Sequence, residues 1–157
     1  MLYAALKTVH FLSLVAWVGG MFFMLACVRP SLGVLEGPAR MRLMREVMGR
    51  FFAIVNVVIG LMLLSGIWML WIARGVRGSM SNLPPAWYVM IGLGLVMIGV
   101  YEYVRGSLFR RMKAALDAQD GAAAAAAMGK IRSAVTFNLI LGVVVIVVMK
   151  VGVAAQS

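Results

Sequence analysis

Long apolar blocks alternate with short polar connections along this chain. The first block covers residues 2–28 and carries a single charge, at Lys7, before Arg29 follows it. Three further blocks cover residues 51–73, 86–108 and 132–153. A helix needs about 20 predominantly apolar residues to cross the hydrocarbon core of a bilayer. The pattern therefore predicts an all-α integral membrane protein, a four-helix transmembrane bundle that takes up residues 1–157 as a single domain.

Composition supports this class. Hydrophobic residues make up 64% of the chain and charged residues only 13%, which lies far from the composition of soluble domains. The formal net charge is +10, and a strongly basic protein raises the question of nucleic-acid binding. Here the cations flank the apolar blocks instead of forming one soluble patch. We therefore expect contact with anionic membrane lipids and no nucleic-acid partner.

The distribution of the cations predicts how the bundle is oriented. Eleven of the fifteen Lys and Arg residues fall in the first and third connections: Arg29, Arg40, Arg42, Arg45, Arg50, Arg105, Arg110, Arg111, Lys113, Lys130 and Arg132. The other four, Lys7, Arg74, Arg77 and Lys150, fall at the opposite ends of the blocks. Because Lys and Arg concentrate on the cytoplasmic side, we expect a bacterial-type inner membrane protein with both termini outside the cytoplasm.

The first connection predicts an extra helix. Arg29-Pro30 is expected to end the first span, and Gly37-Pro38 to open a new helix. The apolar residues at helical spacing after it are Leu43, Met44, Val47 and Met48. They lie opposite Arg42, Arg45 and Glu46, which is the pattern of an amphipathic helix on a membrane surface. We therefore predict a cytoplasmic amphipathic helix between spans 1 and 2.

Candidate functional residues lie on one helical face of each span. In the first, His10, the single histidine, shares a helical face with Ser13, Trp17, Gly20 and Met24. The corresponding face of the second span holds Met62, Ser65, Gly66 and Met69. That of the third span holds Met90, Gly94, Met97 and Tyr101, and that of the fourth holds Asn138, Gly142 and Met149. An ionisable side chain within a span is a functional-site candidate. Imidazole with thioether ligands suits Cu(I), or an axial pair on haem iron.

The expected depth of each side chain in the membrane selects the candidate site residues. His10, Met69 and Met90 are expected near the outer side, with Trp17 on the same face as His10, while Met24 and Cys27 are expected deeper in the membrane. The alternatives stay open: His10 as a packing histidine bonded to Ser13 or to a carbonyl of a neighbouring helix, and the methionines as core filling. Glu102 and Arg105 are expected to pair. Asn56 and Asn138 are expected to hydrogen-bond between helices.

Several stretches resemble the CopD family of small copper-resistance-type membrane proteins. They are Lys7-Thr8-Val9-His10, Ala16 to Phe23, Arg29-Pro30, Arg50-Phe51-Phe52, Ser65-Gly66-Ile67-Trp68 and Ile131 to Gly142. The layout is also similar to that of HemJ-type protoporphyrinogen oxidases, in which the first-span histidine is implicated in haem b binding. The resemblance implies a four-helix bundle with a site around His10. Tyr101-Glu102 stands where such relatives often carry a histidine.

Three function hypotheses remain. The first is a CopD-like protein that binds or passes Cu(I) through His10 with Met69 or Met90, and with Met24 and Cys27 deeper in. The second is a haem b redox protein or HemJ-like oxidase with His10 as axial ligand. The third is a membrane assembly or scaffold subunit. The chain has no Ser/His/Asp set, Cys-x-x-Cys pair or phosphate loop, so an enzyme is expected only as a haem-dependent oxidoreductase. Glycine-rich faces fit a homo-oligomer, and a periplasmic or membrane redox or metal protein is the expected partner.

Overall fold

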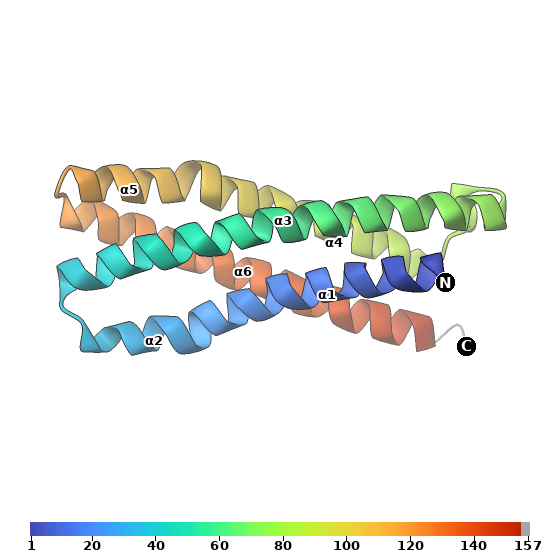
Figure 1. The fold of residues 1–157 in the computed structure, drawn as a ribbon, viewed down its shortest axis with the longest axis horizontal. Helices are drawn as coiled ribbons and strands as arrows, with labels where there is room; N and C mark the ends of the chain where they lie inside the picture. Colours follow the sequence, from blue (N-terminus) through green and yellow to red (C-terminus); the bar gives the residue numbers. More distant parts are fainter. Residues whose placement is uncertain (155–157) are drawn as a thin grey trace.

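The computed structural model describes residues 1–154, apart from the side chains at positions 77, 82 and 152–154. The helices are α1 (Leu2–Phe23), α2 (Arg29–Ser31), α3 (Gly37–Arg77), α4 (Pro85–Tyr103), α5 (Phe109–Asp117) and α6 (Gly121–Ala154). Two π-helical turns, η1 (Met24–Val28) and η4 (Val104–Leu108), join α1 to α2 and α4 to α5. Two short 3₁₀ turns, η2 (Leu32–Val34) and η3 (Met80–Asn82), precede α3 and α4. Figure 1 shows four long rods lying roughly parallel.

The prediction of four membrane-spanning helices is confirmed. Four helical stretches, of 33, 40, 33 and 31 residues, are long and apolar enough to cross a membrane. Each exceeds the roughly 20 residues that a bilayer requires. At a rise of 1.5 Å per residue, α3 alone is about 60 Å long. The rods therefore continue past the apolar blocks that the sequence delimits.

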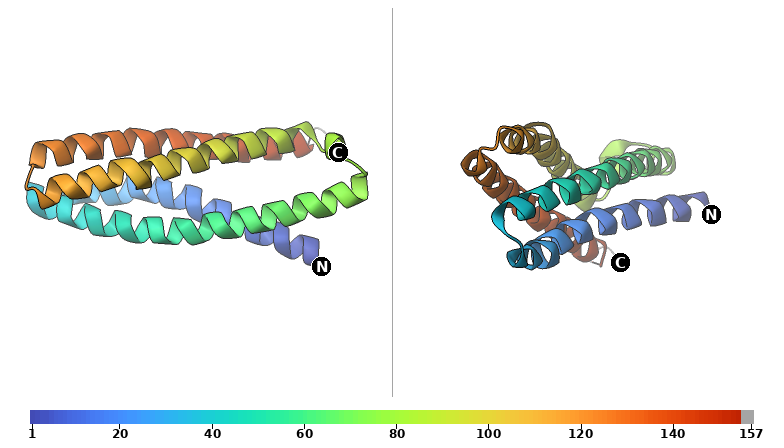
Figure 2. Two further views of the ribbon diagram at one scale, coloured as in Figure 1. Left: turned by 90° about the horizontal axis from the view of Figure 1, so that it is seen from above. Right: turned by 60° about the vertical axis from the view of Figure 1, so that its left-hand side comes forward.

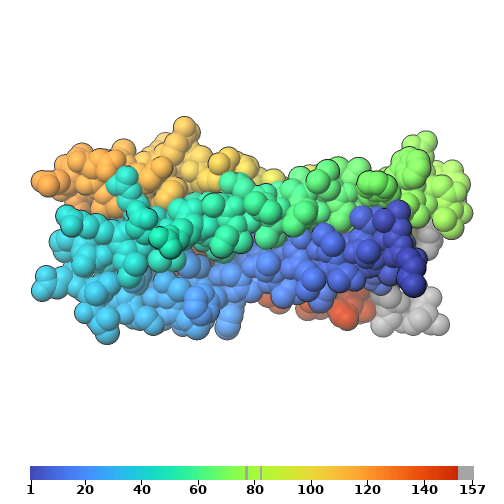
Figure 3. Space-filling view, viewed as in Figure 1, coloured from blue at the N-terminus to red at the C-terminus, as the bar shows by residue number. Residues whose placement is uncertain are grey.

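The rods form two helical hairpins. α1 packs along α3, and α4 and α5 pack along α6, while α1 also contacts α6. Figure 3 shows the side chains of α1 and α3 packed against each other along one face. In Figure 2, α4 and α6 lie together on one side, and the first half of α1 diverges from them beside α3. We call the end that holds the N-terminus the terminal end, and the end that holds α2 and α5 the basic end.

The π-helical turns explain how two rods keep their direction. Pro30 has no N–H and would interrupt an α-helix, yet the chain stays helical as far as Val34. In the π-turn just before it, hydrogen bonds span five residues in place of four. The N–H of Arg29 accordingly bonds to the carbonyl of Met24. The prediction that Arg29-Pro30 ends the helix was therefore wrong. The second π-turn contains Gly106 and Ser107, a pair that often marks distorted helix.

The predicted interfacial helix between spans 1 and 2 is not a separate element. Its residues form the first turns of α3, which continues without a break from Gly37 to Arg77. Met44 and Met48 of its apolar face are 8% and 2% exposed and belong to the core of the bundle. Val47 is half-buried, whereas Leu43 of the same predicted face is 43% exposed. Helices therefore cover only part of the predicted apolar face.

The core runs the length of the bundle and is formed by the predicted inward faces. Trp17, Met97 and Tyr101 are buried, together with Ser65 and Asn138. Small residues let the rods approach closely: a Cβ at Gly142 would lie 2.6 Å from Cγ2 of Val18. Close packing of this kind through small residues is how helices associate in lipid.

Candidate functional site

His10 lies on α1 and is held against the backbone of α3. Its Nδ1–H donates to the carbonyl oxygen of Met62, with Nδ1 and the oxygen 2.9 Å apart. Oγ of Ser65 lies 3.3 Å from the same nitrogen and donates its own proton to the carbonyl of Leu61 at 2.7 Å. Nδ1 is thus fixed by two oxygens from one turn of a neighbouring helix. Of the alternatives left open, the neighbouring carbonyl is the partner of His10.

Gly66 makes this close approach possible. A Cβ at position 66 would lie 3.1 Å from Cε1 of His10 and 3.3 Å from its Nδ1, which is tighter than ordinary van der Waals contact. The absence of a side chain lets the edge of the imidazole ring rest against α3. Gly66 follows Ser65 directly, so one dipeptide supplies both an oxygen and the space for the ring.

The hydrogen bond also determines the chemistry of the ring. A carbonyl oxygen only accepts hydrogen bonds, so Nδ1 carries a proton. In the neutral ring the lone pair is then on Nε2. Histidines that bind metals commonly donate the other ring N–H to a carbonyl or carboxylate, which fixes the ring and raises the basicity of the ligating nitrogen. The Met62 carbonyl has this relation to His10.

The structure brings some of the sequence candidates together and separates others. Met69 lies on α3 one turn beyond Ser65, on the side of the terminal end, and is half-buried. Met90 is also half-buried, but it belongs to α4, which packs against α6 and lies apart from the first half of α1 (Figure 2). Met24 and Cys27 lie in η1. Cys27 lies 17 positions after His10, which corresponds to about 25 Å of helix.

Cys27 and Trp17 differ in burial. The Cys27 side chain is exposed. Trp17 is 1% exposed, and its ring meets that of Tyr101 edge to face at a centroid distance of 6.0 Å. Within the described residues, no three His, Cys, Asp or Glu side chains form a cluster that could hold a metal ion.

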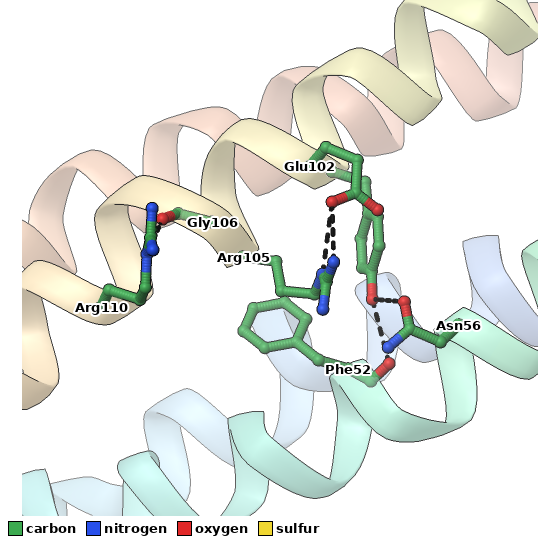
Figure 4. A network of polar contacts seen from close by, with 7 residues as sticks. Phe52, Asn56, Glu102, Arg105, Gly106 and Arg110 are labelled. Carbon is green, nitrogen blue, oxygen red and sulfur yellow. Dashed lines mark hydrogen bonds and ion pairs between the residues drawn. The ribbon is translucent and has the colours of Figure 1, made fainter.

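A second polar site joins α3 to α4. The Tyr101 hydroxyl donates to Oδ1 of Asn56 at 2.8 Å and lies 3.0 Å from the carbonyl oxygen of Phe52 (Figure 4). The predicted ion pair between Glu102 and Arg105 is present at 2.9 Å on the exposed side of the same turn. The interhelical hydrogen bond predicted for Asn56 is present, and its partner, Tyr101, was not among the predicted partners. The signal was available, because Tyr101 falls on the inward face of its span.

Figure 4 also shows that Arg110 of α5 donates a hydrogen bond to the carbonyl of Gly106, which lies in the π-turn η4. The Arg110 guanidinium thus provides a hydrogen-bond donor for a carbonyl of this turn. This contact lies toward the basic end, away from His10.

Comparison with known proteins identifies the family. The model of the family described as copper resistance protein D, CopD, matches residues 45–152. No curated protein and no solved structure shows a significant match to the chain. The matched segment contains α4, α5 and most of α3 and α6. It therefore includes Met62, Ser65 and Gly66, while His10 precedes it. Because the match covers more than half of its length, the chain belongs to the CopD family of copper resistance proteins.

Proposed function

We propose that this membrane protein of copper resistance binds Cu(I) through Nε2 of His10 and passes the ion across the membrane. Membership of the CopD family supports a role in copper resistance. The observation that carries the site is the hydrogen bond from Nδ1 of His10 to the Met62 carbonyl, which leaves Nε2 as a pre-oriented donor.

Cu(I) is the ion that suits this part of the bundle. A soft ion prefers imidazole, thioether and thiolate ligands, whereas Mg²⁺ and Ca²⁺ prefer oxygen. We propose Met69 as the thioether partner, because it lies on α3 one turn beyond the residues that hold the His10 ring. Met90, Met24 and Cys27 then serve as ligands at other points along its passage. Binding at each point must be weak enough to let the ion leave.

Copper binding is tested with the purified protein in mild detergent, loaded with Cu(I) under reducing conditions. We expect His10→Ala to lose the ion in competition with a colorimetric Cu(I) chelator, and Met69→Leu to bind it more weakly. The matched controls are Thr8→Val and Met48→Leu. Thr8 is exposed and its hydroxyl donates to the Ala4 carbonyl of its own helix, and Met48 lies in the core of the basic end. Undiminished Cu(I) binding by a folded His10→Ala protein would overturn the proposal.

The same preparation separates the other functions. An absorption spectrum with a Soret band would point to haem b and a redox function, with His10 as an axial ligand. Retention of neither copper nor haem would favour an assembly subunit. Passage across the membrane is measured in proteoliposomes that enclose a Cu(I) indicator, where His10→Ala should abolish the signal.

We also propose that the basic end faces the cytoplasm and that His10 lies near the outer surface, as the charge bias favours. Single cysteines at Ser79 and Ala118, introduced after Cys27→Ala, lie at opposite ends of the bundle. In intact cells, a membrane-impermeant maleimide should label the first and spare the second. The reverse pattern would invert the orientation.

A further inference from the structure

A small cavity lies where all four rods meet, away from His10. Its volume is about 10 Å³. Its walls include Trp17 and Met21 of α1, Phe52 of α3, Tyr101 of α4 and Asn138 of α6. A cavity of this size has room for one water molecule, and a buried water needs two to four polar partners. Two of the lining residues can supply them.

Asn138 is the first partner. Its side chain is 3% exposed, and its Nδ2 lies 3.7 Å from the sulfur of Met21, which is a weak acceptor. Among the residues that the structure describes, none bonds to Oδ1 of Asn138. Exchanging the amide nitrogen and oxygen leaves the same result, because one polar atom of the amide then faces the sulfur and the other has no protein partner. Buried amides of this kind are commonly satisfied by water.

Tyr101 is the second partner. Its hydroxyl has one proton, and this proton is used toward Asn56 and the Phe52 carbonyl. The hydroxyl oxygen therefore still has capacity to accept a hydrogen bond. Val104, the first residue of the π-turn η4, lines the same cavity. A π-turn departs from the regular packing of an α-helix and frequently marks a functional site.

We propose that one water molecule binds in this cavity and donates to Oδ1 of Asn138 and to the hydroxyl oxygen of Tyr101. The chain Asn138–water–Tyr101–Asn56 then connects α6, α4 and α3 through hydrogen bonds. It joins the two hairpins in a region where most other contacts are apolar. This site is independent of copper, since His10 contacts a different part of α3.

Radiolytic footprinting in ¹⁸O-labelled water tests the proposal. Short X-ray pulses convert bound water into hydroxyl radicals, which oxidise the side chains beside it. We expect Met21, which is 2% exposed, to take up ¹⁸O as a sulfoxide. Met112 is the matched control, because it is 0% exposed and does not line the cavity. Equal, background labelling of Met21 and Met112 would overturn the proposal.

Two variants make the result specific. Asn138→Leu removes the amide and fills the space, so the label on Met21 should be lost while Met112 stays unchanged. Tyr101→Phe removes the other partner and should lower the label on Met21 as well, which provides a second test if Asn138→Leu does not fold. Undiminished labelling of Met21 in a folded Asn138→Leu protein would show that the radical source is not this water.

Discussion

Gly142 is the position where the packing of the bundle makes its sharpest prediction. In Gly142→Ala, the new Cβ on α6 would lie 2.6 Å from Cγ2 of Val18 on α1 and 3.3 Å from Cε of Met97 on α4. The Met97 terminus is flexible and can move. Val18 cannot, because a β-branched side chain in a helix has one strongly preferred rotamer. The helices themselves must therefore separate.

The expected cost follows from two opposing effects. Overpacking a tight core costs about 1 to 3 kcal/mol of unfolding free energy, and a rigid contact of this kind belongs at the upper end. Replacing glycine by alanine within a helix stabilises the helix by about 1 kcal/mol. We therefore expect Gly142→Ala to destabilise the protein by about 2 kcal/mol.

Reversible unfolding in mixed micelles of mild detergent and SDS measures this free energy. Gly20→Ala is a graded comparison, since its Cβ would meet the Phe51 ring edge at 2.7 Å, and this half-buried ring can turn aside at lower cost. Gly99→Ala is the control, because no atom lies within 4 Å of its added Cβ. Adding Val18→Ala should recover much of the loss in Gly142→Ala. Equal stability of Gly142→Ala and Gly99→Ala, or no rescue by Val18→Ala, would contradict a close contact between Gly142 and Val18.

Two further substitutions test the polar contacts. Tyr101→Phe leaves the Oδ1 of Asn56 without its 2.8 Å donor. Because Asn56 is itself exposed, the substitution should cost what one ordinary hydrogen bond contributes, about 0.5 to 1.5 kcal/mol in the same unfolding assay. The exposed Tyr103→Phe should change stability by less than about 0.5 kcal/mol, and equal effects would contradict the role of the Tyr101 hydroxyl. Arg45→Gln breaks an ion pair with Asp117 at 2.6 Å, whose side chains are 35% and 65% exposed. It should cost less than about 1 kcal/mol, and a loss that persists in high salt would contradict a screened surface pair.

The sequence predicts the inward faces well, and the reason is geometric. A helix repeats every 3.6 residues, so residues spaced three or four apart must share a face whatever packs against it. Trp17, Ser65, Tyr101 and Asn138 were all assigned to inward faces in this way, and all are buried. The spacing of polar and apolar residues thus determines which side of each rod faces the others.

Periodicity does not determine what covers a face. Met44 and Met48 form an apolar stripe that fits a membrane surface as well as it fits a helix bundle, and the structure places them in the core. Periodicity also does not reveal the π-turn before Pro30. That turn depends on which backbone carbonyl accepts each N–H hydrogen bond, and side-chain spacing carries no information on this. Both features arise from contacts between segments and from hydrogen-bond shifts that side-chain spacing does not encode.

The partners of His10 belong to this second kind of information, because they depend on how far α1 slides along α3. Two close approaches fix that alignment: Gly20 against Phe51, and Gly66 against the imidazole itself. A shift of one turn would place His10 opposite Met69 or Val58 in place of Met62 and Ser65. Met62, Ser65 and Gly66 lie within the segment that matches the CopD family, whereas His10 precedes it.

Gly66→Ala, which crowds the ring without touching Nε2, should therefore weaken Cu(I) binding about 10-fold if the alignment of the two helices orients the ligand. Unchanged affinity would show that the ring binds copper without help from α3.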